Sequence, residues 1–164
     1  MLRSPTLYRL DKLYSFVIKV GSNFQSLFLF YMRLVWGHQF LITGLGKLSN
    51  IQSTADFFAS LNFAFPLFHA YMVGIFEAVC GFLLLIGFAS RLASIPLIFI
   101  MLTALSTAHA PELSNFRFFL EPLSLVKQAP YPFLITAILV FIFGPGRISV
   151  DAWLKRWIDN QPRY

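Results

Sequence analysis

The sequence predicts an all-α protein, a four-helix transmembrane bundle with interfacial amphipathic helices. The first observation is composition: 57% of the 164 residues are hydrophobic, 20 are Phe and only 12% are charged. A soluble domain carries about 25% charged residues. Second, the apolar residues form runs long enough to cross a bilayer, for which about 20 residues span roughly 30 Å. Third, Lys and Arg gather at the ends of these runs, which is typical of membrane topology and not of a nucleic-acid interface.

The predicted spans cover residues 24–46, 70–89, 92–110 and 130–144. We expect one membrane domain over residues 24–148, preceded by an arm at 1–23 and followed by a tail at 149–164. No Gly/Ser-rich or low-complexity linker divides the chain. The sequence therefore predicts a single membrane domain with two flanking segments.

The distribution of Lys and Arg predicts the orientation. Nine of them flank the spans on the side that holds both termini, and three lie on the other side. Because positive residues are retained in the cytoplasm, both termini are expected there. We thus predict a multi-pass protein of the bacterial plasma (inner) membrane.

Three flanking stretches have an apolar face at helical spacing, which suits a helix lying in the membrane interface. Their apolar residues are Leu10, Leu13, Tyr14 and Val17 in the arm, Phe57, Phe58 and Leu61 between the first two spans, and Trp153, Leu154, Trp157 and Ile158 in the tail. Gly144 and Gly146 permit a tight turn before the tail, and Ser149 is a predicted cap of its helix.

Arg33 and Glu77 are ionisable residues inside predicted spans. An arginine at a span centre costs about 3 kcal/mol on insertion scales, so Arg33 is not expected to face lipid unpaired. A rise of about 1.5 Å per residue places Arg33 and Glu77 near the midplane of antiparallel helices. The sequence therefore predicts that Glu77 is the partner of Arg33.

Glycines surround both charges. Gly37 and Gly44 lie on the Arg33 face, and Gly74 and Gly81 flank Glu77. Small residues allow helices to approach closely, so these two faces are predicted to pack together. The pair is either a structural ion pair that fixes helix register or the lining of a polar cavity that binds a headgroup, a quinone or a proton.

The histidines supply further candidates. His38, His69 and His109 all lie on the predicted non-cytoplasmic side, and Glu112 follows His109. Their spacing matches no metal-ligand pattern, so no metal site is predicted. The candidate cofactor-binding residues are Arg33, His38, Glu77 and His109. Arg33 would donate hydrogen bonds, Glu77 would accept them, and a neutral imidazole can do either.

Four motifs together resemble those of a known family. In chain order they are FYMRLVWGHQFLITGLGKL, GIFEAVCGFLLLIGFASRLA, TALSTAHA and GPGRISVD. From about residue 30 to residue 151 the chain resembles the DoxX family of small bacterial and archaeal membrane proteins. By position, the family pattern falls on Arg33, Gly44, Lys47, Glu77, Gly81, Gly87, Arg91, His109, Gly146, Ser149 and Asp151.

The resemblance implies a four-helix membrane bundle. Some members resemble the small membrane subunit of a thiosulfate:quinone oxidoreductase. Others are linked to oxidative stress or to quinone and catechol resistance, as membrane partners of soluble redox enzymes. The lone Cys80 permits no internal disulfide, so electron chemistry would need a bound cofactor, a substrate or a partner.

Two functions are compatible with the sequence, and whether the chain is itself an enzyme stays open. In the first, it is a redox-associated membrane subunit that binds a quinone or similar amphiphile between its helices. In the second, it is a non-enzymatic anchor that recruits a soluble redox or stress-response partner through its basic cytoplasmic face. A transporter is not favoured, because no inverted repeat or broken helix pair is detectable.

Overall fold

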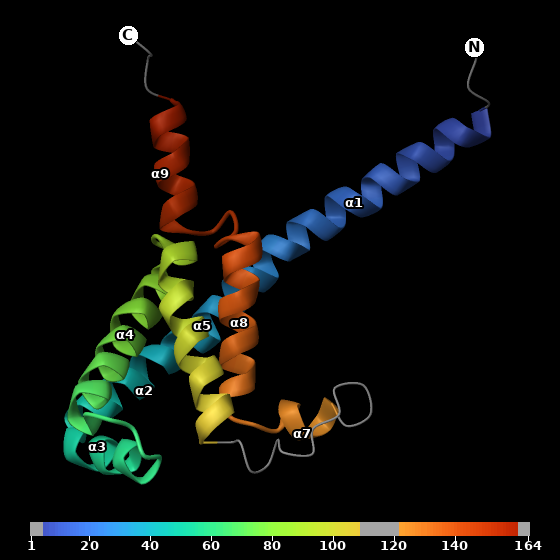
Figure 1. Ribbon diagram of the computed structural model, residues 1–164. Coiled ribbons are helices and arrows are strands. Elements are labelled where there is room, and N and C mark those ends of the chain that lie inside the picture. Colours follow the sequence, from blue (N-terminus) through green and yellow to red (C-terminus); the bar gives the residue numbers. More distant parts are fainter. Residues whose placement is uncertain (1–4, 109–121, 161–164) are drawn as a thin grey trace.

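The computed structural model describes residues 5–108 and 122–160, and within these ranges the regular structure is entirely helical (Figure 1). The helices are α1 (Pro5–Met32), η1 (Arg33–Gly37), α2 (His38–Ser49), α3 (Ile51–Ser60), α4 (Pro66–Ile86), α5 (Ser90–Thr107), α7 (Pro122–Val126), α8 (Pro130–Phe143) and α9 (Val150–Asp159). For the described residues, the predicted all-α class is confirmed.

The first predicted span lies within a longer helical run. α1, η1 and α2 follow one another without a break, because Met32, Gly37 and His38 all have right-handed helical backbone angles. η1 is a π-helical turn, which inserts one residue and rotates the face that the following helix presents. The arm is thus not a separate helix, as the sequence suggested, but the N-terminal half of α1, which projects away from the other helices (Figure 1).

In the part of the chain that the structure describes, two helices are long and apolar enough to cross a membrane. They are α4 with 21 residues and α5 with 18, and the similarly apolar α8 is shorter at 14 residues. α4 begins at Pro66, four residues before the predicted start, because proline suits the first helical turn. α5 and α8 agree with the predicted third and fourth spans to within a few residues.

Helices α2 and α4 are in very close contact at their glycines. A Cβ atom on Gly44 would lie 2.8 Å from the Gly74 carbonyl oxygen, and one on Gly81 would lie 2.6 Å from the Leu41 amide nitrogen. Both positions therefore exclude any side chain. The predicted packing of the two glycine-bearing faces is confirmed, and it fixes how α2 and α4 are offset along their axes.

α5 and α8 form the other side of the helical body, the name used here for the packed helices η1, α2, α4, α5 and α8. Their buried residues, with those of α2 and α4, make up one apolar core: Phe40, Cys80, Leu84, Ala93, Leu97, Met101, Leu105, Leu134, Ala137 and Val140. Phe133 of α8 also meets Trp36 and Phe40 edge-to-face, with ring centroids 4.9 and 4.7 Å apart. α8 thereby closes the body against η1 and α2.

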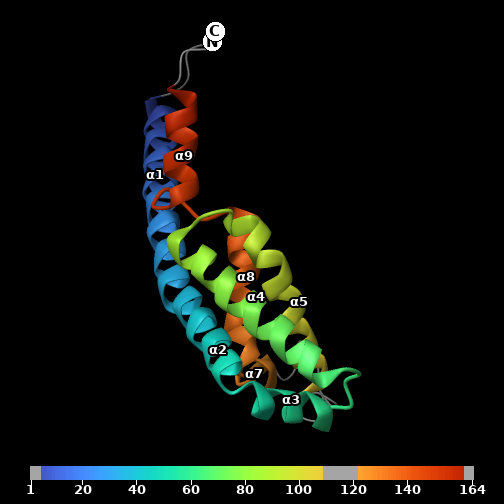
Figure 2. The ribbon, with the colours of Figure 1, turned by 90° about the vertical axis from the view of Figure 1, so that its left-hand side faces the viewer.

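The two ends of the body differ. The start of α1, the end of α9 and the turn between α4 and α5 lie toward one end, and α3 and α7 lie toward the other (Figures 1 and 2). Figure 2 shows that α1 and α9 both project beyond the body at the first end. The predicted cap of the tail helix is confirmed, since the Ser149 hydroxyl accepts a hydrogen bond from the Ala152 amide at 3.1 Å.

Candidate functional site

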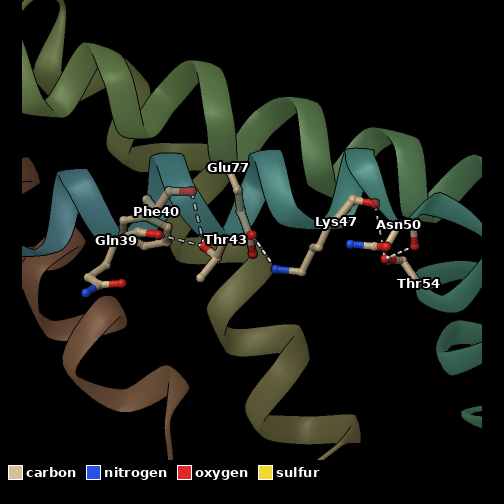
Figure 3. Close-up of polar contacts among 7 residues, drawn as sticks. All are labelled: Gln39, Phe40, Thr43, Lys47, Asn50, Thr54 and Glu77. Atoms are coloured by element: carbon tan, nitrogen blue, oxygen red, sulfur yellow. Dashed lines mark hydrogen bonds and ion pairs between the residues drawn. The ribbon is translucent and has the colours of Figure 1, made fainter.

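A buried ion pair joins α2 to α4 near the α3 end. The Glu77 side chain is only 2% exposed, and its carboxylate meets the ammonium group of Lys47, which is 32% exposed (Figure 3). Lys47 lies one turn after Gly44, so the close approach at that glycine brings the two side chains together. The pair combines a carboxylate shielded from solvent with a cation that reaches the surface.

Thr43 completes this polar group. Its hydroxyl donates to the Gln39 carbonyl at 2.9 Å and lies close to the Glu77 carboxylate (Figure 3). Thr54 of α3 donates to the Lys47 carbonyl at 3.2 Å and so ties α3 to the end of α2. α3 is therefore joined to the end of α2 that carries the ion pair.

A cavity of about 490 Å³ lies beside the ion pair. Its polar lining includes Thr43, Lys47, His69 and Glu77. Its aromatic lining is Phe57, Phe58, Phe63, Phe99 and Phe133, and most of the other lining residues are apolar side chains of α4 and α5. The cavity is thus an apolar chamber with aromatic walls and a charged pair on one side, which is the usual character of a small-molecule site.

His69 occupies an aromatic part of this lining. Its ring lies 5.3 Å from the Phe63 ring and 6.2 Å from the Phe58 ring, measured between centroids. The Nδ1 atom lies 3.2 Å from the Phe65 carbonyl oxygen, so Nδ1 carries the proton if this contact is a hydrogen bond. The other ring nitrogen is then a hydrogen-bond acceptor.

The predicted Arg33–Glu77 pair is wrong. Arg33 is fully buried, but its guanidinium donates to the carbonyl oxygens of Leu84, at 3.4 Å, and of Ile148. Leu84 lies seven residues beyond Glu77, about 10 Å further along α4. Arg33 and Glu77 therefore lie at different levels along α4.

The error comes from the axial offset of the helices. The prediction counted depth from residue 24, the start of the apolar run, whereas α1 extends past the end of α4 before the two meet. From residue 11 onward, Leu29 is the first buried residue of α1, and Arg33 follows it by one turn. Arg33 consequently lies level with the end of α4 and not with its middle.

Arg33 instead belongs to a cluster that closes two helix ends, here called the Arg33 cluster: Arg33, Leu84, Gly87, Ile148 and Asp151. The guanidinium faces the last carbonyls of α4, where a cation suits the helix dipole. The Asp151 carboxylate accepts hydrogen bonds from the amides of Ala89 at 2.8 Å and Ser90 at 3.2 Å, at the start of α5.

Gly87 makes the cluster compact. Its φ of +76° lies in the left-handed region, and its carbonyl accepts a hydrogen bond from the Asp151 amide at 3.0 Å. A Cβ atom at this position would collide with the Arg33 guanidinium and lie 2.6 Å from the Ser149 Cβ. The Arg33 cluster thus ties the segment before α9 to the turn between α4 and α5.

The remaining candidates are dispersed. His38 is exposed on α2 and does not line the cavity, and His109 lies outside the described residues. Of the three predicted residues that the structure describes, Glu77 is the one that lines the cavity. Among the described residues, no group of three His, Cys, Asp or Glu side chains is arranged to hold a metal ion.

Sequence reasoning missed Thr43, Lys47 and His69 as residues of one site. A usable signal existed for Lys47, because it lies on the same helical face as Gly37 and Gly44 and falls on the family pattern. No comparable signal marked the aromatic walls, since Phe is frequent throughout the chain.

Comparison with known proteins gives a related protein and a family. The chain is 26% identical over 131 residues to the protein described as "Putative oxidoreductase CatD" of Bacillus subtilis (strain 168), a match that covers 79% of this chain and 88% of the relative. No solved structure matches the chain. The family model DoxX matches residues 28–110, which hold both Arg33 and the Lys47–Glu77 pair. The chain belongs to the DoxX family.

Proposed function

We propose that the chain crosses the plasma membrane four times, with both termini in the cytoplasm and the bilayer around its helical body. The lengths and apolar character of α4 and α5 support this topology, as does the apolar α8. Arg91, Arg147, Lys155 and Arg156 belong to the end from which α1 and α9 project, whereas Lys47 and Lys127 belong to the end with α3 and α7. This asymmetry agrees with a cytoplasmic location of the first end.

Reporter fusions test the topology. Fusions at residue 2 and at the C-terminus should both read cytoplasmic, and a fusion at Asn62, between α3 and α4, should read outside. Asn62 suits an insertion because it is exposed and lies in a turn. Termini on opposite sides of the membrane would overturn the four-span arrangement.

We further propose that the protein is a redox-associated membrane subunit that binds a quinone or similar flat amphiphile. The observation that carries this proposal is the cavity of about 490 Å³ with the Lys47–Glu77 pair on its lining. Ligand pockets usually have volumes of about 300–1,000 Å³ and combine apolar walls with a few polar groups. A quinone ring offers two carbonyl acceptors and two flat faces, which match this lining.

The residues have separate roles in the proposed site. The Lys47 ammonium group, with three donors, would hydrogen-bond a ring carbonyl while it remains paired with Glu77. Phe133 and Phe99 would pack on the ring, because aromatic pairs favour offset or edge-on contact. Glu77 would hold Lys47 in place and would not itself bond the ring, because a quinone carbonyl cannot donate a hydrogen bond. Arg33 and His38 would have no role in binding.

A redox role is supported by similarity to the protein described as "Putative oxidoreductase CatD". The chain has a single cysteine, so a soluble redox partner would have to supply or accept the electrons. The anchor function differs in one respect: it requires the partner but no ligand in the cavity. Ligand binding therefore separates the two functions.

The decisive measurement is quinone binding by the purified protein. We expect quinone to co-purify above the detergent background, and added decylubiquinone to bind with a measurable Kd. Glu77→Gln should weaken binding about tenfold, because Lys47, the proposed donor to the ring carbonyl, loses the charged partner that holds it at the cavity. Ala104→Phe, which adds a ring inside the cavity, should abolish binding.

Two matched variants serve as controls. Leu102→Phe adds the same ring to an exposed face of α5, and His38→Ala removes an exposed imidazole on α2. Both should bind like the wild type. Absence of quinone in the wild type, or equal loss in Leu102→Phe and Ala104→Phe, would leave only the anchor function.

A further inference from the structure

An apolar stripe runs along α1, and with its last residue into η1, on the face turned away from the helical body. It consists of Leu13, Val17, Val20, Phe24, Leu27, Tyr31 and Leu34. These side chains are 37–65% exposed, whereas Leu29 on the opposite face is 2% exposed and packs toward the body. None of the described residues therefore packs over the stripe.

The spacing of the stripe is strictly periodic. Successive members are separated alternately by four and three residues over three heptads. This period of 3.5 residues, shorter than the 3.6 of a straight helix, is the pattern of a left-handed coiled-coil seam. In heptad terms, Val17, Phe24 and Tyr31 take the a positions, and Leu13, Val20, Leu27 and Leu34 take the d positions.

A hollow in the same face supports this assignment. It has a volume of about 660 Å³, and its lining residues are Phe24, Leu27, Phe28, Phe30, Tyr31 and Leu34. Every one of them holds an a, d, e or g position of the heptad. These are the positions that form the holes into which a partner helix inserts its side chains.

Lipid would not cover the whole stripe. The helical run from Pro5 to Ser49 has 45 residues, which corresponds to about 67 Å, against roughly 30 Å of hydrocarbon. Leu13, Val17 and Val20 lie in the half of α1 that projects beyond the body (Figure 1). Apolar side chains there would be exposed to water unless protein covers them.

We propose that a second copy of this chain covers the stripe, through a parallel α1–α1 coiled coil. The inference rests on the proposed membrane topology, because two copies inserted in the same orientation present their α1 helices in parallel. A two-fold axis along the membrane normal places the same heptad positions of both copies opposite each other. An unrelated partner would need the same repeat in the same register, whereas a second copy has it by identity.

The available area suits a stable dimer. Stable interfaces bury about 800 Å² on each partner, and a single Phe or Tyr side chain buries about 150–250 Å². The stripe holds Phe24 and Tyr31 with five aliphatic residues, flanked by Tyr14, Phe16 and Phe28, which are also exposed. The seam therefore reaches the required size without other parts of the body.

Disulfide crosslinking in native membranes tests the interface. Cys80 is buried, so Cys80→Ser gives a background without thiols. On that background, Val17→Cys and Val20→Cys should form covalent dimers on mild oxidation, because equivalent a and d residues face each other. Ser15→Cys and Ser22→Cys, at f positions on the opposite face of the same helix, should crosslink at least tenfold less.

A second measurement follows the oligomeric state of variants that place charges in the seam. Val17→Asp with Val20→Asp should convert the dimer to a monomer, measured by light scattering in detergent and by photobleaching steps in membranes. Ser15→Asp with Ser22→Asp should remain dimeric. Equal crosslinking at all four cysteine positions, or a monomeric wild type in membranes, would overturn the coiled coil. If the reporter fusions place the termini on opposite sides of the membrane, the proposed topology fails. If they confirm the topology but the protein is a monomer, only the proposed dimer is rejected.

Discussion

The two ends of the helical body each hold a cation at a contact between helices, but the partners of the two cations differ. At the α9 end, Arg33 is fully buried and donates to main-chain carbonyls at the end of α4 and before α9. At the α3 end, Lys47 is partly exposed and pairs with the buried Glu77 carboxylate beside a cavity. One cation holds helix ends together, and the other is placed where a ligand could reach it.

This difference separates structural from functional charges. A guanidinium can bond several carbonyls at fixed angles, which suits the capping of a helix end. A lysine on a flexible stem can keep its partner and still turn toward a ligand. Of these two sites, the Lys47–Glu77 pair lines a cavity with room for a second molecule, whereas Arg33 does not line that cavity.

The largest expected effect follows removal of the buried arginine. Arg33→Met should destabilise the protein by about 3–5 kcal/mol, because it leaves carbonyls of α4 and the Asp151 carboxylate without their cation. The melting temperature in detergent measures this loss. Arg91→Met, at an exposed arginine that donates to the Ile142 carbonyl, should cost less than about 1 kcal/mol. Similar melting of the two variants would contradict a structural role specific to Arg33.

An intermediate and asymmetric effect is expected at the ion pair. Lys47→Met should cost about 3 kcal/mol, because it leaves Glu77 charged and buried or forces it to take up a proton. Glu77→Gln should cost only about 1 kcal/mol, because Lys47 can extend into water. Lys47→Met with Glu77→Leu should be more stable than the sum of the single changes predicts. Thermal melting of all the variants gives the comparison, and a larger loss in Glu77→Gln than in Lys47→Met would reject it.

The smallest effect should come from the cap of α9. Ser149→Ala removes the hydroxyl that accepts the Ala152 amide, which typically costs about 1 kcal/mol. Because α9 projects from the body, the loss should appear as faster amide hydrogen exchange in α9 with little change elsewhere. Ser15→Ala removes a hydroxyl from an exposed site inside α1 and serves as the control. Equally fast exchange across α4 and α5 would show that α9 is coupled to the body more tightly than the contacts indicate.

Local chemistry made several features predictable. Apolar runs predicted α4, α5 and α8 because a helix of that composition must satisfy its backbone internally, whatever its neighbours are. Paired glycines predicted the α2–α4 contact because only small residues permit it. The Ser149 cap was predictable because it depends on a hydroxyl three residues from its amide partner.

The partners of the charged residues were decided by the tertiary structure. The helical class, the glycine contact, the cap and the ionisable groups in apolar helices could be predicted without the fold, since each follows from composition or from spacing within one segment. Which residue meets Arg33 depends on how far α1 extends past α4 and on where the chain returns at Ile148. The cavity likewise requires α2, α3, α4, α5 and α8 to converge. Sliding one helix by seven residues along its neighbour changes every pair of residues in contact but leaves the periodicity of each helix unchanged. The pairing is therefore a property of the assembled fold.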